Sequence, residues 1–248
     1  MRTTLSLLSA VALAWSGATS AATPCGTTVA ENPDTGAVFG HLLYAEAAAA
    51  DLAAAPPGFA GPGCEVLHRD AAAALDRLLA AARADPSVGI ALYGVSCFRS
   101  VSRQSGIYCS RGRSLAALAA RARTSAPPGH SEHATGYTID FGDRRRRSCE
   151  VGACFADTAA GRWLLANAPT FGFEMSFPAG NGQGVAWEPW HWRWVGTSII
   201  PDGALTARKV FGPARRRYPS DRVQPDLPPL PPAPVPIFAP APLPDLDR

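Results

Sequence analysis

The sequence predicts an α+β fold in which helices pack on a small, mostly antiparallel sheet. Two observations predict this class. Apolar side chains recur at helical spacing in several segments, and short runs rich in β-branched and aromatic residues lie between these segments. The chain has 248 residues, 47% of them hydrophobic, so its central part is long enough to bury one sizeable core. No internal repeat is apparent, and we expect one folded domain.

The first 22 residues are typical of a secretory signal peptide. They have a charged start, an apolar run over residues 5–15 and small residues as far as Ala22. The apolar run is too short to span a bilayer comfortably as a permanent helix, although an uncleaved membrane anchor is the alternative. We expect cleavage near residue 21 or 22 and a mature protein without a membrane span, exported to the periplasm, the extracellular medium or the cell wall.

The six cysteines agree with export, because an even number of cysteines outside the cytoplasm favours disulfides. Pairing of neighbours along the chain is the simplest of the roughly 15 arrangements that six cysteines allow. A structural zinc site made of cysteines is the alternative, but no two of them have the close two-residue spacing of such sites. The predicted bridges are therefore Cys25–Cys64, Cys97–Cys109 and Cys149–Cys154.

Residues 23–64 mix proline, glycine and alanine, and predict an N-terminal wrap rather than a second domain. We expect a short helical piece in its alanine-rich part, residues 42–55. In the segment that follows, Leu75, Leu78 and Ala82 recur at the spacing of one helix face. Helices are expected at residues 70–83, 114–123 and 158–168.

Short runs of β-branched and aromatic residues indicate the strands. Pro189 cannot donate a hydrogen bond to a sheet ladder, so the last strand is expected to begin near Trp190. Its alternate residues Trp190, Trp192 and Trp194 are expected in the core and in the wall of a pocket. Strands are expected at residues 90–96, 137–141, 171–177 and 190–195.

Proline dominates the chain from residue 213, and more clearly from Pro219, through residue 248. This composition favours an extended polyproline conformation and cannot bury a core. We expect residues 213–248 to be a disordered tail or spacer, with a docking peptide for a partner as the alternative, and residues 65–212 to form the folded domain. The formal charge of +3 gives no case for nucleic acid binding, and we expect a monomer.

Four polar side chains near the predicted strands suit a metal-dependent hydrolase. His133 and Asp140 are separated by six residues, enough for a turn that runs into strand 137–141, and His191 lies at the start of the last strand. Two imidazoles and one carboxylate match the ligand set of a catalytic zinc, whose fourth position is left for water. Glu188 is a spare carboxylate that can move protons beside the metal. We expect one zinc ion per chain, with iron as the alternative for this ligand set.

Three motifs follow one another along the chain. They are Phe98-Arg99-Ser100-x-x-x-Gln104, Ser131-x-His133-x-x-Gly136-x-x-x-Asp140 and Glu188-x-x-His191. Together they resemble the zinc D-alanyl-D-alanine carboxypeptidase family, which includes the vancomycin-resistance D,D-peptidases and shares its metal site with hedgehog-type domains. The likeness covers roughly residues 65 to 196. Phe98 and Thr138 stand where this family has Tyr and Ala, and neither change removes a ligand.

The resemblance implies a hedgehog/D,D-peptidase-like zinc fold and a zinc metallopeptidase that hydrolyses the terminal D-alanine peptide bond of peptidoglycan stem peptides. Alternatives are an L,D-carboxypeptidase, a D,D-dipeptidase, an endopeptidase that cuts within the stem, and a non-catalytic zinc-containing module that binds the cell wall. Glu188 argues against the last of these, because a binding module has no evident use for a carboxylate beside the ligands.

The motif residues outside the ligand set then have defined roles. Glu188 takes a proton from the attacking water and returns it to the departing amine. Arg99 stabilises the oxyanion or the substrate carbonyl, because a fixed planar cation matches developing negative charge, and a structural salt bridge is its alternative role. Gln104 and Ser131 hydrogen-bond polar groups of the substrate or brace the loop.

Residues beside the motifs are expected to have lesser roles. His130 is expected behind the ligands or exposed, and Glu132 in solvent. His41 and His68 lie outside every motif, so structural or surface positions are expected for them. The arginine run at residues 144–147 is expected to be a solvated face, with a foothold on an anionic wall polymer as the alternative.

Overall fold

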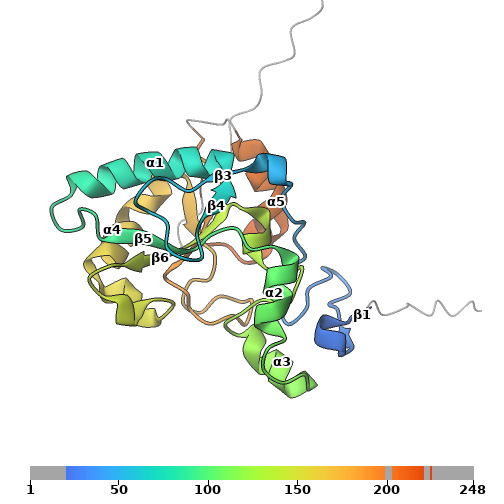
Figure 1. Ribbon diagram of the computed structural model, residues 1–248. Coiled ribbons are helices and arrows are strands. Elements are labelled where there is room, and N and C mark those ends of the chain that lie inside the picture. The colour runs from blue at the N-terminus through green and yellow to red at the C-terminus, as the bar shows by residue number, and fades with distance from the viewer. Residues whose placement is uncertain (1–20, 199–202, 221–223, 225–248) are drawn as a thin grey trace, which may run out of the picture.

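The computed structural model describes residues 21–198, 203–220 and 224 (Figure 1). Residues 1–20 of the predicted signal peptide and nearly all of the predicted tail beyond residue 220 lie outside the described residues. Within the described part, no helix combines the length and the apolar character needed to cross a membrane.

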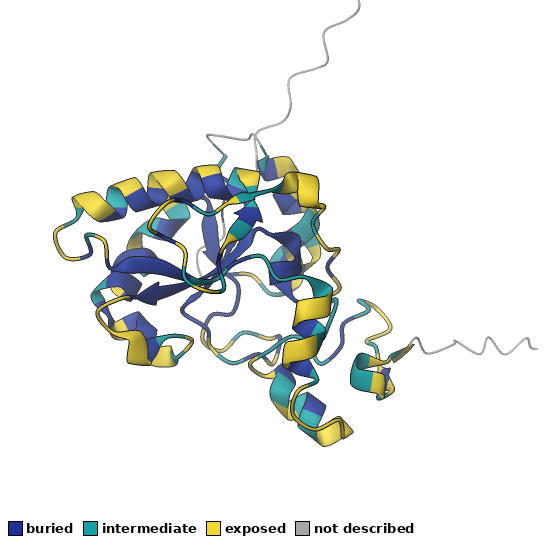
Figure 2. Cartoon of the chain, viewed as in Figure 1, coloured by how far each residue is buried: buried dark blue, intermediate teal, exposed yellow. Residues whose placement is uncertain are grey.

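A four-stranded sheet lies at the centre of the molecule (Figure 1). Its neighbouring strands are all antiparallel, and β6 and β8 in its middle are buried along their full length (Figure 2). The structure therefore confirms the predicted α+β class. In spatial order the strands are β5 (Leu92–Ser96), β6 (Thr138–Asp143), β8 (His191–Trp194) and β7 (Phe173–Met175).

The described residues form five α-helices around this sheet. They are α1 (Arg69–Ala84), α2 (Val101–Tyr108), α3 (Leu115–Ala122), α4 (Ala159–Asn167) and α5 (Ala204–Arg217). The predicted helices correspond to α1, α3 and α4. In α1 the side chains of Leu75 and Leu78 are fully buried, and the ring of His68 accepts a hydrogen bond from the backbone N–H of Asp70 at the first turn. Spacing of apolar residues was sufficient for these three helices because the buried residues of each are apolar.

Helices α2 and α5 are not predicted from the sequence, and each differs from the other three helices for a physical reason. In α2 only Gln104 and Tyr108 are buried, so the helix has almost no apolar periodicity. Helix α5 contains Pro213, which usually breaks a helix, yet the buried side chains of Ala207 and Phe211 hold it on the core. It runs to Arg217, so the folded part continues past the boundary expected at residue 212.

The N-terminal part of the chain wraps the core with short strands and extended segments. Strand β1 (Ala21–Ala22) pairs with β2 (Val29–Ala30), and β3 (Leu52–Ala54) pairs with β4 (Val66–His68). The helical piece predicted at 42–55 is reduced to a 3-10 turn at Ala49–Asp51, because long-range hydrogen bonds use the backbone before it. The N–H of Tyr44 donates to the carbonyl of Gly129, and that of Ala47 donates to the carbonyl of Ala134.

The described structure contains three disulfides, and two of the three predicted pairings are wrong. The pairs are Cys25–Cys109, Cys64–Cys97 and Cys149–Cys154. The predicted partner of Cys97 fails because the backbone around Gly63 runs beside β5, where the N–H of Cys97 donates to the carbonyl of Gly63. That contact brings Cys64 next to Cys97 and leaves Cys109, just after α2, to bond with Cys25.

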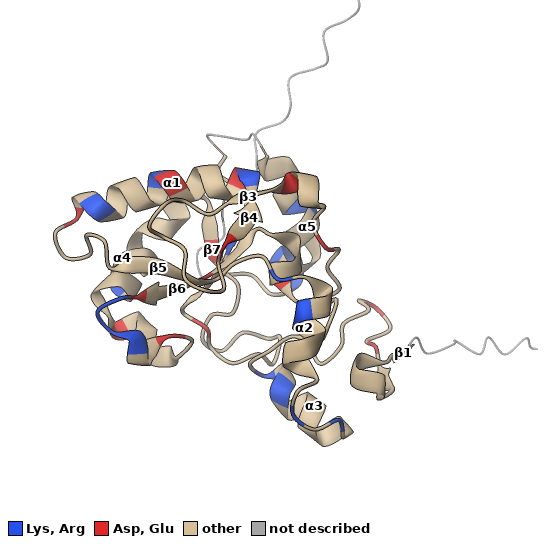
Figure 3. Cartoon of the chain, viewed as in Figure 1, with Lys and Arg blue, Asp and Glu red and all other residues tan. Residues whose placement is uncertain are grey.

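The arginine run at residues 144–147 follows β6 and is exposed, as predicted (Figure 3). Three of its four arginine side chains nevertheless contact other parts of the protein. Arg144 lies over the ring of Tyr93, Arg145 donates to the carbonyls of Ser87 and Val88, and Arg147 pairs with Glu150. The run therefore holds neighbouring loops together, which weakens the alternative that it binds an anionic wall polymer.

Candidate metal centre and active site

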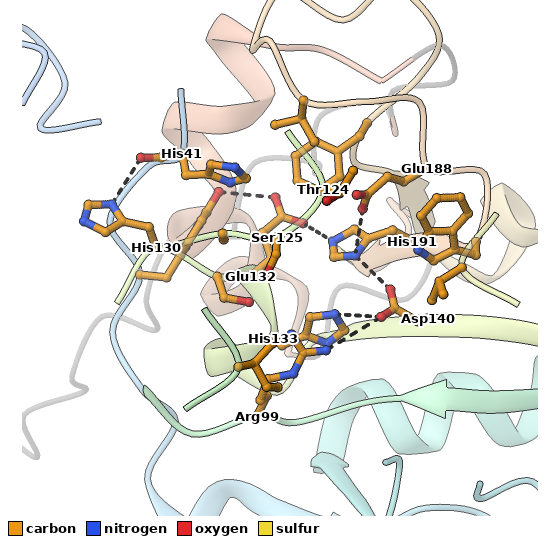
Figure 4. A pocket seen from close by; sticks show the side chains of 18 of the residues that line it. His41, Arg99, Thr124, Ser125, His130, Glu132, His133, Asp140, Glu188 and His191 are labelled. Atoms are coloured by element: carbon orange, nitrogen blue, oxygen red, sulfur yellow. Dashed lines mark hydrogen bonds and ion pairs between the residues drawn. The ribbon is translucent and has the colours of Figure 1, made fainter. Parts of the chain in front are cut away.

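The three side chains predicted as metal ligands lie together beside the central sheet (Figure 4). One ligand atom from each of His133, Asp140 and His191 lies within 4.8 Å of the others, and all three residues are buried. The Nε2 atom of His133 is 3.1 Å from Oδ2 of Asp140, and the Nδ1 atom of His191 is 2.9 Å from Oδ1 of the same carboxylate. The structure thus brings together the complete predicted set.

Strand pairing and one tight turn produce this convergence. Asp140 and His191 are directly paired across β6 and β8, so their side chains leave the sheet on the same face. His133 comes from a 3-10 turn just before β6. Gly136 ends this turn with a φ of 73°, a left-handed conformation that glycine adopts readily. A Cβ atom there would also lie 3.0 Å from the backbone nitrogen of His68, so space favours glycine as well.

Hydrogen bonds behind the two imidazoles leave one nitrogen of each free to bind a metal. The Nδ1 atom of His133 is 2.7 Å from the carbonyl oxygen of Cys97, which can only accept, so Nδ1 carries the proton and Nε2 faces Asp140. The Nε2 atom of His191 is 3.2 Å from a carboxylate oxygen of Glu132, so its Nδ1 faces Asp140. These residues fit a metal ion, because ligating histidines commonly donate their other N–H to such acceptors.

The charges around the ligands favour a cation. Burial by itself lowers the pKa of His191, but its hydrogen bonds to Asp140 and Glu132 outweigh burial and raise that pKa to about 10. Burial would raise the pKa of Asp140, yet the two ligand histidines hold it well below its usual range. The centre therefore gains stability from positive charge between the carboxylates, which a divalent metal can supply.

Glu188 lies at the wall of the same cavity, next to the ligands. Its Oε2 atom is 3.7 Å from Nδ1 of His191, and the N–H of His191 donates to the carbonyl of Glu188 across a turn that contains Pro189. Burial raises the pKa of Glu188 to about 8, against the opposing effect of His191. A carboxyl group with a pKa near neutrality can both take and return a proton.

Arg99 is held rigidly beside the centre. Its guanidinium lies 3.9 Å from Asp140 and donates to the hydroxyl of Ser96 and to Oε1 of Gln104, each at 2.7 Å. Gln104 is 1% exposed and donates its own amide to the carbonyl of Ala126, so its polar atoms are used within the protein. In this geometry Gln104 links Arg99 to the loop that contains Ala126.

A cavity of about 500 Å³ opens onto the centre. The predicted substrate-binding residue Ser131 lines it, together with Trp190, which lies in the pocket wall as expected. Ile107 of α2 and Val151 of the loop closed by Cys149–Cys154 also line it, and both are exposed, so they form an apolar rim at its mouth. The cavity is thus polar where the ligands lie and apolar where it meets solvent.

Glu132 does not lie where the sequence predicts it. It was expected in solvent, but it is 4% exposed and accepts hydrogen bonds from Tyr44, Ser176 and Arg193 as well as facing His191. Burial would raise its pKa, but Arg193 above all lowers it to about 2. One signal was available in the sequence. Arg193 stands between two tryptophans of a buried strand, and a buried cation needs an anionic partner.

The other histidines outside the motifs have structural positions. His130 is buried, and its Nδ1 lies 3.1 Å from the carbonyl oxygen of His41. The ring of His41 is buried at the cavity and its Nε2 lies 2.7 Å from the carbonyl oxygen of Ala122. His68 stacks on Tyr137. Of these, His130 and His41 line the cavity, so they shape the site without joining the metal ligands.

A buried cluster of two imidazoles and a carboxylate, with a further carboxylate at the wall of a cavity, is a site of the kind that metal-dependent hydrolases use. Residues 65–197 match the family model of VanY, D-alanyl-D-alanine carboxypeptidase. The chain belongs to this family of peptidases, as the three motifs predict.

Individual relatives agree with the family. The chain is 34% identical over 151 residues to the putative carboxypeptidase YodJ of Bacillus subtilis (strain 168), covering 58% of this chain and 53% of that protein. It is 29% identical over 118 residues to a D-alanyl-D-alanine carboxypeptidase of Enterococcus faecium, covering 47% of this chain and 33% of that protein. The match thus spans between a third and about half of these relatives.

One solved structure extends the comparison to the fold. The LdcB LD-carboxypeptidase, whose structure addresses peptidoglycan recognition, aligns with a TM-score of 0.53 and 30% sequence identity. The alignment covers 65% of this chain and 77% of that chain. The fold of this chain is therefore similar to that of the LdcB LD-carboxypeptidase.

Proposed function

We propose that the protein is an exported, zinc-dependent carboxypeptidase that removes the terminal D-alanine from peptidoglycan stem peptides, with one zinc ion per chain. The observation that carries the proposal is the convergence of His133, Asp140 and His191 with one free nitrogen on each ring, while Glu188 lies beside them at the cavity wall. The family match supports the choice of a peptide bond as the substrate.

The metal would be held by Nε2 of His133, Nδ1 of His191 and the carboxylate of Asp140. A zinc ion bound there supplies a Lewis acid for the scissile carbonyl and lowers the pKa of a water molecule to about 7. The protein contributes the buried, negatively charged setting and the fixed orientation of both rings.

Glu188 is the proposed proton carrier. It lies within reach of the centre without being one of the three converging ligands, and its raised pKa suits proton transfer in both directions. It would accept the proton of the attacking water and deliver it to the departing amine nitrogen of D-alanine. Proton transfer by a positioned side chain contributes roughly 10² to 10⁴ in rate.

Arg99 is the proposed electrostatic partner of the scissile carbonyl. Its two hydrogen bonds, to Ser96 and Gln104, fix the guanidinium before substrate arrives, so little reorganisation is needed during the reaction. Ser131 lines the cavity, and in the proposal it hydrogen-bonds a polar group of the peptide.

A second candidate is an L,D-carboxypeptidase, which removes D-alanine from an L,D bond. It is favoured by one observation, the likeness to the LdcB LD-carboxypeptidase structure. Both candidates use the same three metal ligands and the same proton carrier. They differ in the residue that precedes the scissile bond.

Digestion of defined stem peptides tests the proposal. Purified, zinc-loaded protein is incubated with a pentapeptide ending in D-Ala-D-Ala and with the tetrapeptide that lacks the last residue, and the products are weighed. Loss of one alanine from the pentapeptide supports the first candidate, and loss from the tetrapeptide supports the second. A released dipeptide would instead indicate a D,D-dipeptidase, and split muropeptides would indicate an endopeptidase. Absence of any product from zinc-loaded protein would favour a wall-binding module.

A further inference from the structure

We infer that Glu132 is a positioning residue of the metal centre, which holds the ring of His191 with Nδ1 toward the metal and is itself held by the buried Arg193. The inference rests on the proposed metal site and goes beyond the ligands and the proton carrier. It assigns a function to the carboxylate that sequence reasoning placed in solvent.

The carboxylate of Glu132 joins two neighbours on β8. Its Oε2 atom is 3.2 Å from Nε2 of His191, and its Oε1 atom is 3.1 Å from Nη1 of Arg193. His191 and Arg193 are two residues apart on one strand, so their side chains leave the sheet on the same face. The hydroxyls of Tyr44 and Ser176 also donate to Glu132. Four donors therefore fix its position.

The ring of His191 needs such a partner more than the ring of His133 does. Either nitrogen of a neutral imidazole can carry the proton, and rotation of the ring by half a turn exchanges the two positions. For His133 a backbone carbonyl, that of Cys97, selects the proton position. For His191 the side chain of Glu132 makes this choice, and its negative charge also makes the free nitrogen a better electron donor to a metal.

Arg193 connects Glu132 to a second buried carboxylate. Arg193 is 1% exposed, and its Nε lies 3.5 Å from an oxygen of Glu174, which is fully buried. Glu174 in turn accepts hydrogen bonds from Arg215 of α5 and from the backbone N–H of Gln224. Alternating charges thus run from the metal centre to α5, and each anion in the row has a cation beside it.

Glu174 offers a matched control, because it pairs with the same arginine and does not contact a metal ligand in the described structure. If Glu132 only neutralised Arg193, both Glu132→Gln and Glu174→Gln would lower stability and neither would change metal binding. Glu132→Gln keeps only one of the two acceptor oxygens. Because Oε1 faces Arg193 and Oε2 faces His191, one of these two residues loses its acceptor. Glu132→Asp keeps the charge beside Arg193 and shortens the reach to His191.

The test measures zinc affinity by competition with a chelator, together with the free energy of unfolding of each metal-free protein. We expect Glu132→Gln and Glu132→Asp to weaken zinc binding by about 10- to 100-fold and Glu174→Gln to change it by less than about threefold. In the cobalt-substituted proteins, the visible absorption of both position-132 variants should differ from that of the wild type, because it reports ligand geometry.

Two outcomes overturn the inference. One is that both position-132 variants bind zinc within about threefold of the wild-type affinity. The other is that Glu174→Gln loses as much zinc affinity as the position-132 variants do. His133→Ala separates this failure from failure of the metal site itself. If the wild type binds no zinc, or binds it no better than His133→Ala, the proposed metal centre is wrong, whatever Glu132 does.

Discussion

Asp140 and His191 face each other across β6 and β8, with Oδ1 of the carboxylate 2.9 Å from Nδ1 of the ring. Direct pairing in an antiparallel sheet fixes this relationship, because a strand that shifts by one residue sends its own side chain to the opposite face, away from its partner. The centre is therefore built on the two buried strands in the middle of the sheet. His133, on the turn before β6, completes it.

Replacement of the proton carrier should separate metal binding from catalysis. We expect Glu188→Gln to retain zinc and to lower kcat by about 10² to 10⁴, because the amide cannot carry a proton between water and amine. Zinc content by elemental analysis and turnover of a stem peptide give the two readouts. Turnover near the wild-type rate with full zinc occupancy would show that another group carries the proton.

Arg99 and Gln104 should act as a unit. Arg99→Ala is expected to cost about 2.7 to 4 kcal/mol of transition-state stabilisation, the value typical of one lost donor to developing negative charge. Gln104→Ala should cost less, because it acts by bracing Arg99. The double variant should then lose little more than Arg99→Ala alone, measured as kcat/KM. Additive losses would mean that Gln104 contacts the substrate independently.

Removal of the metal should lower both activity and stability. A chelator is expected to abolish hydrolysis, and added zinc to restore it and to raise the Tm, because a ligand that binds only the folded state stabilises it by mass action. His133→Ala is the matched control, whose Tm should not respond to zinc. Stoichiometric iron without zinc in the purified active protein would reverse the choice of metal.

The pH dependence of stability should contain a contribution from His41. Burial lowers the pKa of this histidine from 6.5 to about 4, partly opposed by its hydrogen bond to the carbonyl of Ala122. The unfolded state therefore binds more protons than the folded state between these pH values, and stability falls as the pH drops from 6.5 toward 4. The full loss is on the order of 3 kcal/mol, at about 1.36 kcal/mol for each pH unit.

His41→Gln isolates this contribution, since glutamine can still donate to Ala122 but does not titrate. Unfolding of both metal-free proteins in denaturant at pH 7, 5.5 and 4 gives the comparison, in which groups common to both cancel. The wild type should lose more stability than the variant as the pH falls. Parallel pH curves would contradict the prediction.

The disulfide pairing can be tested directly. A non-reducing peptide map should join Cys25 to Cys109 and Cys64 to Cys97. Joint replacement of Cys25 and Cys109 by serine should cost about 2 to 5 kcal/mol of stability, because the bond ties the N-terminal segment to the end of α2. Joint replacement of Cys149 and Cys154 is the control with a much shorter loop, for which a smaller loss is expected.

The sequence alone was enough for those features that depend on local pattern. The apolar spacing in α1, α3 and α4 predicted these helices, and β-branched and aromatic runs predicted the four strands of the central sheet. The ligand set was equally accessible, since His133, Asp140, His191 and Glu188 lie in motifs whose residue types suit a metal and a proton carrier. Both kinds of feature can be predicted because they depend on the types and spacing of residues that are close in sequence.

Contacts between distant residues decided the rest. The pairing of Cys25 with Cys109 depends on a segment folded back over 84 positions, and the burial of Glu132 depends on Arg193, 61 positions away. The backbone of 42–55 likewise bonds to residues near 129 and 134, and its only helical part is a 3-10 turn at Ala49–Asp51. A carboxylate read alone is expected in water, and only the folded chain, by supplying a buried cation, could make its burial favourable.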